Sequence, residues 1–248
     1  MRKIIFELCA ETLQACLAAR EGGADRIELC TALSEGGLTP SHGLTRAAIL
    51  RSRLPVHVLL RPRSGDFHYT DDEFSLMRED LLHAHSLGAS GFVLGILRTD
   101  GTVDMERTRE LVELAAPLEI TFHRAIDYTI SLEQALEDVI ATGCKRVLTS
   151  GGEPDVLAGA DELARLVEIA DGRIDIAVGG GLRIKDAAAL ARATGASHFH
   201  GSLRRSEASK MQHERRWVLE DPDSLDGTSR FVVNAGDVRT MIGNLRSA

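Results

Sequence analysis

Two copies of the tripeptide Glu-Leu-Cys, ending at Cys9 and Cys30, place a carboxyl and a thiol at the ends of two β-rich runs. Alternate residues of a strand point to the same face, so Glu7 shares a face with Cys9, and Glu28 shares one with Cys30. A thiolate is a ligand for soft metal ions, and a carboxyl can accept or donate a proton. The repeat therefore predicts two polar pairs on neighbouring strands, both facing the interior of the fold.

Arginine and histidine occupy comparable positions further along the chain. Arg61 and Arg63 close one β-rich run. His123 closes another, with Asp127 in the loop that follows, and His200 lies in the last. Two arginines one pleat apart could clamp an anionic group. A carboxylate could then act as general base and an imidazole as general acid. The predicted catalytic residues are Glu7, Glu28, Arg61, Arg63, His123 and Asp127.

Glycine-containing loops follow the last three β-rich runs. Their backbone N–H groups could meet an anion, because loops at the corresponding end of α/β barrels commonly bind phosphate. The glycines could equally serve only to make tight turns. The predicted ligand-binding residues are Ser150, Gly151, Gly180, Gly181, His200 and Ser202.

These residues need elements that bring their strand ends together, and the chain supplies β-rich runs that alternate with helical patterns. The runs are 4–9, 26–30, 56–61, 91–96, 119–123, 146–150, 174–178 and 198–201. Parallel strands that close into a barrel present all their C-terminal ends at one mouth. The order predicts an α/β fold, a single-domain (β/α)8 TIM barrel over residues 1–248, a length typical of that fold.

The helical stretches between the runs support the same topology. They are 12–21, 45–52, 71–87, 105–115, 132–142, 160–170 and 184–194. Several end in glycine just before the next run, as at Gly88, Gly143 and Gly195, where a left-handed C-cap is expected. The first turn between a strand and a helix carries no GxGxxG, which argues against a dinucleotide-binding Rossmann fold.

The end of the chain is less regular. Residues 206–230 are polar and mixed in charge, and are predicted to form an irregular excursion before the closing helix of the barrel in 231–248. An alternative interpretation is that Trp217 and its neighbours cover a pocket or a contact between subunits.

Composition limits the classes of partner. Apolar residues make up 44% and aromatic residues 4%, which favours an aliphatic core under helices. The net charge of -8 argues against nucleic acid and against anionic membrane surfaces. The N-terminus lacks the apolar stretch of a signal peptide, and no apolar run approaches the ~18 residues of a membrane span. We therefore expect a cytoplasmic protein whose four cysteines stay reduced.

Ordered motifs along the chain resemble the CutC family. They are Glu-Leu-Cys at 28–30, Glu-Gly-Gly-Leu-Thr-Pro-Ser at 35–41, Arg-Pro-Arg with Gly-Asp-Phe and Tyr69 at 61–69, Thr-Phe-His-Arg-Ala at 121–125, and Leu-Thr-Ser-Gly-Gly at 148–152. The resemblance runs from about residue 4 to about residue 205. It implies a TIM-type barrel and a role in copper homeostasis.

Copper(I) prefers thiolate ligands and accepts imidazole. Cys9 and Cys30 are therefore the predicted metal ligands, and His200 could join them because the eighth strand of a barrel closes against the first. The predicted partner is a copper ion or a small anionic ligand, with no nucleic acid and no membrane. Association into a homo-oligomer is compatible with these features.

Two other interpretations stay open. The cysteines could be small core hydrophobes, and the two glutamates could pair with Arg61 or Arg63 inside the barrel. The pocket could instead belong to an enzyme of isomerase, aldolase or hydrolase type that acts on a small anionic or phosphorylated metabolite, because fold alone does not decide function. The enzyme interpretation explains the arginines and carboxylates, which copper does not require.

Overall fold

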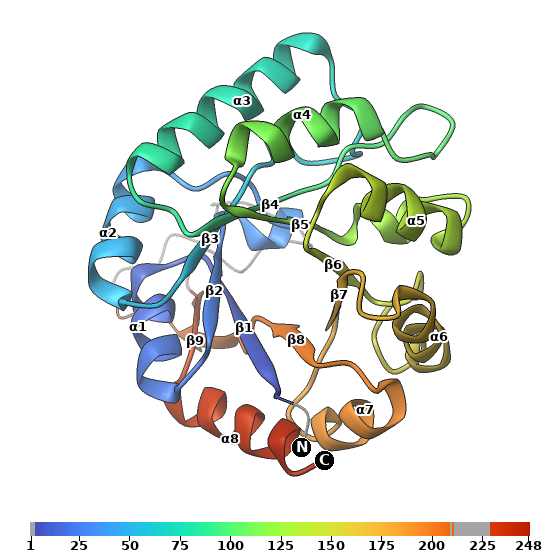
Figure 1. Ribbon diagram of the computed structural model, residues 1–248. Helices are drawn as coiled ribbons and strands as arrows, with labels where there is room; N and C mark the ends of the chain where they lie inside the picture. Colours follow the sequence, from blue (N-terminus) through green and yellow to red (C-terminus); the bar gives the residue numbers. More distant parts are fainter. Residues whose placement is uncertain (1–2, 209, 211–228) are drawn as a thin grey trace, which may run out of the picture.

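Eight parallel strands form a closed barrel in chain order, with β8 paired to β1 (Figure 1). The protein is represented by a computed structural model, in which residues 3–208, 210 and 229–248 are described. The strands are β1 (Ile5–Ala10), β2 (Arg26–Leu29), β3 (Val56–Leu59), β4 (Gly91–Leu94), β5 (Glu119–Phe122), β6 (Arg146–Thr149), β7 (Asp175–Gly179) and β8 (His198–Gly201). The predicted (β/α)8 barrel is confirmed.

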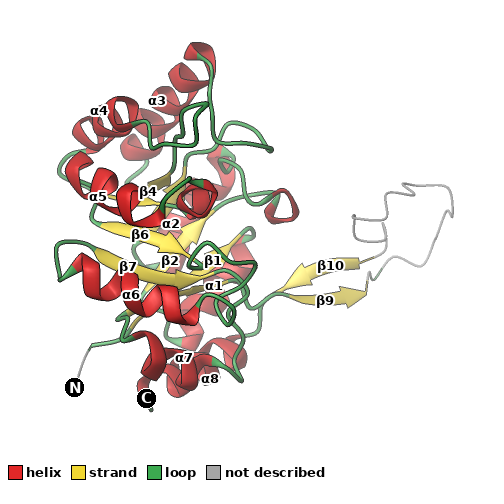
Figure 2. Ribbon diagram, turned by 90° about the vertical axis from the view of Figure 1, so that its right-hand side faces the viewer, coloured by secondary structure: helices red, strands yellow, loops and turns green. Residues whose placement is uncertain are grey.

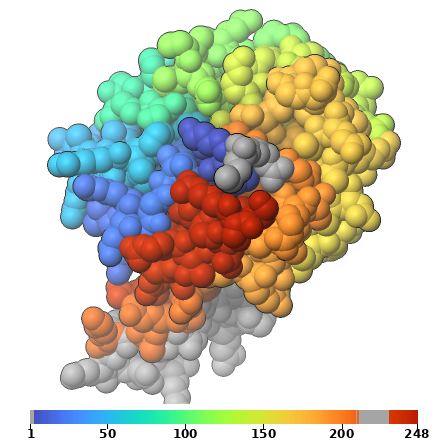
Figure 3. Space-filling view, turned by 60° about the horizontal axis from the view of Figure 1, so that its bottom comes forward, coloured from blue at the N-terminus to red at the C-terminus, as the bar shows by residue number. Residues whose placement is uncertain are grey.

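Helices surround the barrel and bury its outer face. They are α1 (Leu13–Gly22), α2 (His42–Ser52), α3 (Asp71–Ser86), α4 (Met105–Ala115), α5 (Leu132–Thr142), α6 (Ala160–Ala170), α7 (Ala187–Thr194) and α8 (Ala235–Arg246). The last helix packs against α1 and α7, and Figure 3 shows the red C-terminal part of the chain beside its blue N-terminal part. Among the described residues, no helix is long and apolar enough to cross a membrane.

Local sequence signals account for most helix ends. The Thr12 hydroxyl accepts a hydrogen bond from Ala15 N at 3.1 Å and so caps α1. Gly143 and Gly195 end α5 and α7 in the left-handed conformation, as predicted. The predicted start of the seventh helix at residue 184 is wrong, because residues 184–186 form a turn and α7 begins at Ala187.

Several strands are shorter than predicted at their C-terminal ends. Cys30, Arg61, His123 and Ser150 were expected to close strands, but each lies just beyond one. The chain leaves the sheet at these points to cross toward the next helix, so the backbone no longer keeps strand pairing. These side chains are therefore positioned by loops as well as by the alternation of the strand.

The two faces of β1 divide as the alternation predicted. Phe6 and Leu8 belong to the apolar layer between barrel and helices. Glu7 is paired in register with Arg26 of β2 and His200 of β8, and Cys9 with Glu28 of β2. The interior of the barrel is thus polar on this side, with charged side chains almost completely buried.

The segment before the last helix is partly a hairpin. Strands β9 (Arg205–Ala208) and β10 (Ser229–Val232) pair antiparallel and project away from the barrel (Figure 2). The expectation of an irregular excursion over all of 206–230 is therefore wrong at both ends, where backbone pairing between the two segments stabilises extended structure. Trp217 lies outside the described residues. The predicted closing helix is present as α8.

Candidate functional site

A cavity of about 330 Å³ opens at the C-terminal ends of the barrel strands. Most of the predicted site residues converge there, some from the strands and others from the loops that follow them. Those that line the cavity are Cys9, Glu28, Arg61, His123, Gly180, Gly181, His200 and Ser202. Cys30 lies directly behind Cys9 and is fully buried.

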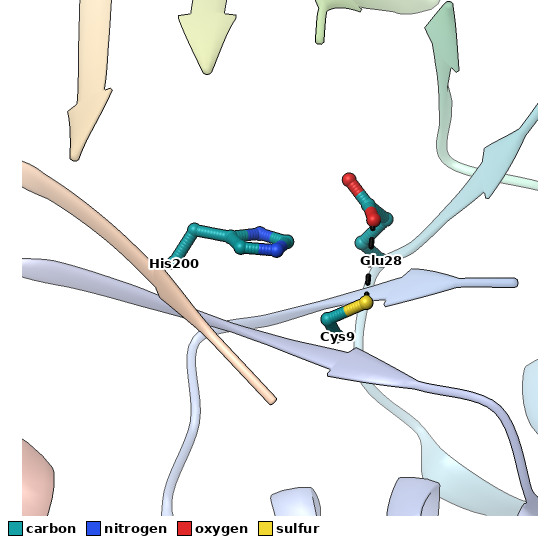
Figure 4. Close-up of side chains that lie close together, drawn as sticks. All are labelled: Cys9, Glu28 and His200. Atoms are coloured by element: carbon teal, nitrogen blue, oxygen red, sulfur yellow. Dashed lines mark hydrogen bonds between the residues drawn. The ribbon is translucent and has the colours of Figure 1, made fainter. Parts of the chain in front are cut away.

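A cluster of three potential metal ligands forms one wall of this cavity (Figure 4). One ligand atom each from Cys9, Glu28 and His200 lies within 4.8 Å of the other two. The Cys9 thiol donates a hydrogen bond to Glu28 Oε1 at 3.4 Å, and its Sγ lies 3.7 Å from Cys30 Sγ. Cys9 therefore lies at the junction of β8, β1 and β2, with Glu28 and His200 close to its sulfur and Cys30 in contact with it.

Glu7 supports this cluster from below and does not line the cavity. Its carboxylate accepts a hydrogen bond from the Arg26 guanidinium. Its Oε1 also forms a hydrogen bond with His200 Nδ1, at a distance of 2.8 Å. The expectations that Glu7 lines the mouth and could pair with Arg61 or Arg63 are therefore wrong. Arg26 was not predicted as a site residue, because it begins β2 and the predicted residues were taken from the C-terminal ends of the strands.

Burial and neighbouring charge set the protonation of the cluster. Burial alone would raise the pKa of Glu7, but Arg26 and His200 hold that pKa well below its ordinary value. Burial raises the pKa of Glu28, which favours its neutral acid. The pKa of Cys9 is raised well above its ordinary value by the Cys30 contact and by burial. Against the effect of burial, Glu28 and Glu7 raise the pKa of His200. One anion, Glu7, thus anchors a network of proton donors.

His123 is held as a neutral ring on the opposite side of the cavity. Its Nδ1 accepts a hydrogen bond from Ala125 N at 3.1 Å. Burial, followed by the charge of Arg61, lowers its pKa to about 3. The ring packs against Phe67 at a centroid distance of 5.0 Å. With Nδ1 used as an acceptor, the proton of the neutral ring lies on Nε2.

The two arginines predicted as a clamp have different positions. The Arg61 guanidinium lines the cavity and is held by carbonyl oxygens of Glu35, Gly37 and Gly65. Arg63 is not among the lining residues and forms surface ion pairs with Asp66 and Glu73. The paired clamp is therefore wrong, because both residues follow the end of β3 and the loop sends them to different sides.

Asp127 and the loop after β6 serve to shape the site. The Asp127 carboxylate accepts hydrogen bonds from the Thr149 hydroxyl and from the backbone N–H groups of Ser150 and Gly152. Asp127, Ser150 and Gly151 do not line the cavity, contrary to their predicted direct roles. Asp127 also accepts from Arg124 Nε, and the Arg124 side chain does line it.

Arg124 stood in the Thr-Phe-His-Arg-Ala motif, but strand alternation gave it no inward position. It belongs instead to a short 3₁₀ segment, Arg124–Tyr128, that turns above the barrel. Close to it lies Gly180, whose φ of +115° suits glycine and where a Cβ would lie 3.0 Å from the Arg124 guanidinium carbon. The glycine permits this close approach of loop and side chain.

Gly95 makes room for His123, and a Gly95→Ala variant is expected to be destabilised by about 1–3 kcal/mol. The new Cβ would lie 2.4 Å from His123 Nδ1 and 2.7 Å from the Ala125 Cβ. Urea unfolding followed by circular dichroism measures the change. The control is Gly43→Ala in α2, where a Cβ meets nothing within 4 Å and a small gain of about 0.5–1 kcal/mol is expected. Equal stability of Gly95→Ala and wild type would contradict the tight packing around His123.

Comparisons with known proteins agree with the fold and the motifs. The sequence profile of the CutC family matches residues 4–205. A family protein CutC of Chromobacterium violaceum is 46% identical over 237 residues, covering 96% of both chains. One of Bacteroides thetaiotaomicron is 42% identical over the full length of both. A crystal structure from Streptococcus agalactiae, described as a candidate copper homeostasis protein CutC, superposes with a TM-score of 0.76 at 32% identity and covers 80% of this chain and 98% of its own. The chain therefore belongs to the CutC family.

Proposed function

We propose that this protein binds Cu(I) in the cytoplasm as part of copper homeostasis, with Cys9 and Cys30 as thiolate ligands and His200 as an imidazole ligand. The observation that carries the proposal is the meeting of two sulfur atoms, 3.7 Å apart, with a histidine beside Cys9 at the base of a cavity. The copper homeostasis description of the Streptococcus agalactiae relative supports the same function.

The donor set suits a soft ion. Two metal–sulfur bonds of about 2.3 Å can span the distance between the Cys9 and Cys30 sulfurs with a bent S–Cu–S arrangement. His200 can complete the set, since Glu7 already holds its Nδ1. Proteins commonly orient a metal-binding histidine through a carboxylate that is hydrogen-bonded to the ring nitrogen that does not bind the metal.

Binding should release protons, because thiols bind metal as thiolates. The raised pKa of Cys9 means that its thiol keeps its proton until copper replaces it. The affinity for Cu(I) is therefore expected to increase with pH. The cytoplasmic location agrees with this chemistry, since all four cysteines are free thiols and Cu(I) is the reduced form of the metal.

Competition with a chromophoric Cu(I) chelator tests the proposal directly. Wild type is expected to bind one Cu(I), and a Cys9→Ser, Cys30→Ser variant to bind at least about 100-fold more weakly, because a hydroxyl is a poor ligand for a soft ion. A Cys16→Ser, Cys144→Ser variant removes two other buried thiols and should keep wild-type affinity.

Glu28→Gln distinguishes a copper site from a site for a harder metal. A carboxylate contributes little to Cu(I), so the Cu(I) affinity of this variant should stay within about threefold of wild type. If wild type binds Cu(I) no more tightly than the Cys9, Cys30 variant does, the copper proposal is wrong. A large loss in Glu28→Gln would point to a divalent ion that uses the Cys9, Glu28 and His200 group instead.

A further inference from the structure

Arg61 is a buried cation without an anionic partner. Only 5% of the residue is exposed, and among the described residues no carboxylate forms an ion pair with it. Arg124 and Arg204, which also line the cavity, are paired with Asp127 and Glu11. Burying a charge is costly unless an opposite charge compensates it. Because the positive charge of Arg61 has no such partner, a bound anion that is not part of the chain would compensate it.

The Arg61 guanidinium is fixed in place by groups that carry no charge. Nη1 donates to the carbonyl oxygens of Glu35 and Gly37 at 2.7 and 3.0 Å, and Nη2 donates to that of Gly65 at 2.7 Å. Nε has no hydrogen-bond partner in the described part of the chain. The carbonyls thus orient the positive group without neutralising it.

A second unsatisfied donor comes from His123. The Ala125 N–H occupies Nδ1, so Nε2 carries the proton, and Nε2 has no partner among the described residues. Phe67 contacts both groups, since its ring lies 5.0 Å from the Arg61 guanidinium carbon and 5.0 Å from the centre of the His123 ring. The guanidinium and the imidazole therefore flank one aromatic side chain that also lines the cavity.

The size and the charge of the cavity exceed what a single copper ion requires. A volume of about 330 Å³ is far more than one ion fills, because even a water molecule takes only about 30 Å³. Of the residues that the structure describes, three arginines but only one with a carboxyl group, Glu28, line the cavity, although the net charge of the chain is -8. Copper, a cation, gains nothing from those arginines. An organic molecule with an anionic oxygen group is compatible with both the volume and the charge.

We propose that the cavity binds a small organic acid, a carboxylate or a phosphate monoester, whose anionic oxygens contact Arg61 and the Nε2–H of His123. This site goes beyond copper binding and does not require it. The ligand body would lie over Phe67, with its other end toward Cys9, Glu28 and His200.

Isothermal titration calorimetry with two probes, malonate and inorganic phosphate, tests the proposal against chloride at matched ionic strength. Wild type should bind at least one probe with saturation. Arg61→Met and His123→Leu should each weaken that binding at least about tenfold, because each removes a buried donor to a charged group. Arg63→Met is the matched control, two residues from Arg61 but outside the cavity, and should bind as wild type does.

Two results would overturn the proposal. One is that neither malonate nor phosphate binds wild type better than chloride does. The other is that a folded Arg61→Met or His123→Leu protein, with a wild-type circular dichroism spectrum, keeps full affinity. His123→Leu keeps the test valid if Arg61→Met fails to fold. Copper binding is measured on the Cys9→Ser, Cys30→Ser variant and probe binding on the Arg61→Met and His123→Leu variants, so a failure of the copper proposal and a failure of the organic-acid proposal give different results.

Discussion

A Glu7→Gln variant is expected to unfold with a free energy about 3–5 kcal/mol below that of wild type. The Glu7 side chain is 2% exposed and pairs with an Arg26 side chain that is 10% exposed. The amide keeps the shape of the carboxyl but leaves the buried guanidinium without an opposite charge. The pKa of Glu7 is held well below its ordinary value, so wild type keeps this stabilisation throughout the neutral range and loses it only as acid protonates the carboxylate.

Urea unfolding at pH 7 measures this loss, and Glu119→Gln provides a matched control. Glu119 also pairs with a barrel arginine, Arg146, but its side chain is 52% exposed, and Arg146 keeps Asp175 nearby. Exposed pairs contribute little, so the control should lose less than about 1 kcal/mol. Similar losses of unfolding free energy in the two variants would show that the buried Glu7–Arg26 pair contributes no more to stability than an exposed pair does. If the copper proposal holds, Glu7→Gln should also bind Cu(I) about 10–100-fold more weakly, because the orientation of His200 relaxes.

The protein is expected to lose stability steeply as the pH falls from 6.5 toward 4, and His57 should account for about 3 kcal/mol of that loss. His57 is buried in the barrel, and burial lowers its pKa to about 4 against the opposing charge of Glu7. The unfolded chain takes up the proton near pH 6.5, whereas the folded chain resists it until about pH 4. Between these values protons favour unfolding, so the free energy of unfolding decreases with decreasing pH.

A His57→Leu variant isolates this contribution. The leucine side chain is apolar and cannot take up a proton. The difference in unfolding free energy between pH 6.5 and pH 4.5 should therefore be smaller in the variant than in wild type. His198, whose pKa is lowered to about 4, and His123, at about 3, remain and keep part of the slope. Urea unfolding curves at several pH values supply the comparison. Parallel curves for variant and wild type would mean that His57 does not resist protonation in the folded state.

The order of strands and helices could be predicted from local patterns alone. Alternation placed Glu7 and Cys9 on the inner face of β1, and glycine after α5 and α7 marked where each helix stops. These properties depend on neighbours within a few residues. The carboxyl ends of parallel strands meet by topology, so the position of the cavity also followed from the sequence.

Distances within the site could not be predicted in the same way. Barrel closure decides that Glu7 lies between Arg26 and His200, residues that are 19 and 193 positions away in the chain. Nothing in the local pattern states that strand eight pairs with strand one at this register.

Beyond the strand ends, side chains no longer alternate between two faces, so their direction cannot be predicted from the sequence. Arg61 and Arg63 look equivalent in the sequence, yet one is buried among backbone carbonyls and the other pairs with surface carboxylates. Asp127 likewise satisfies the N–H groups of a loop rather than entering the cavity. The sequence by itself determined the order of strands and helices and therefore that the strand ends meet at one mouth of the barrel. Tertiary structure decided which side chains face the cavity, because loop backbones and cross-barrel ion pairs depend on contacts between distant segments.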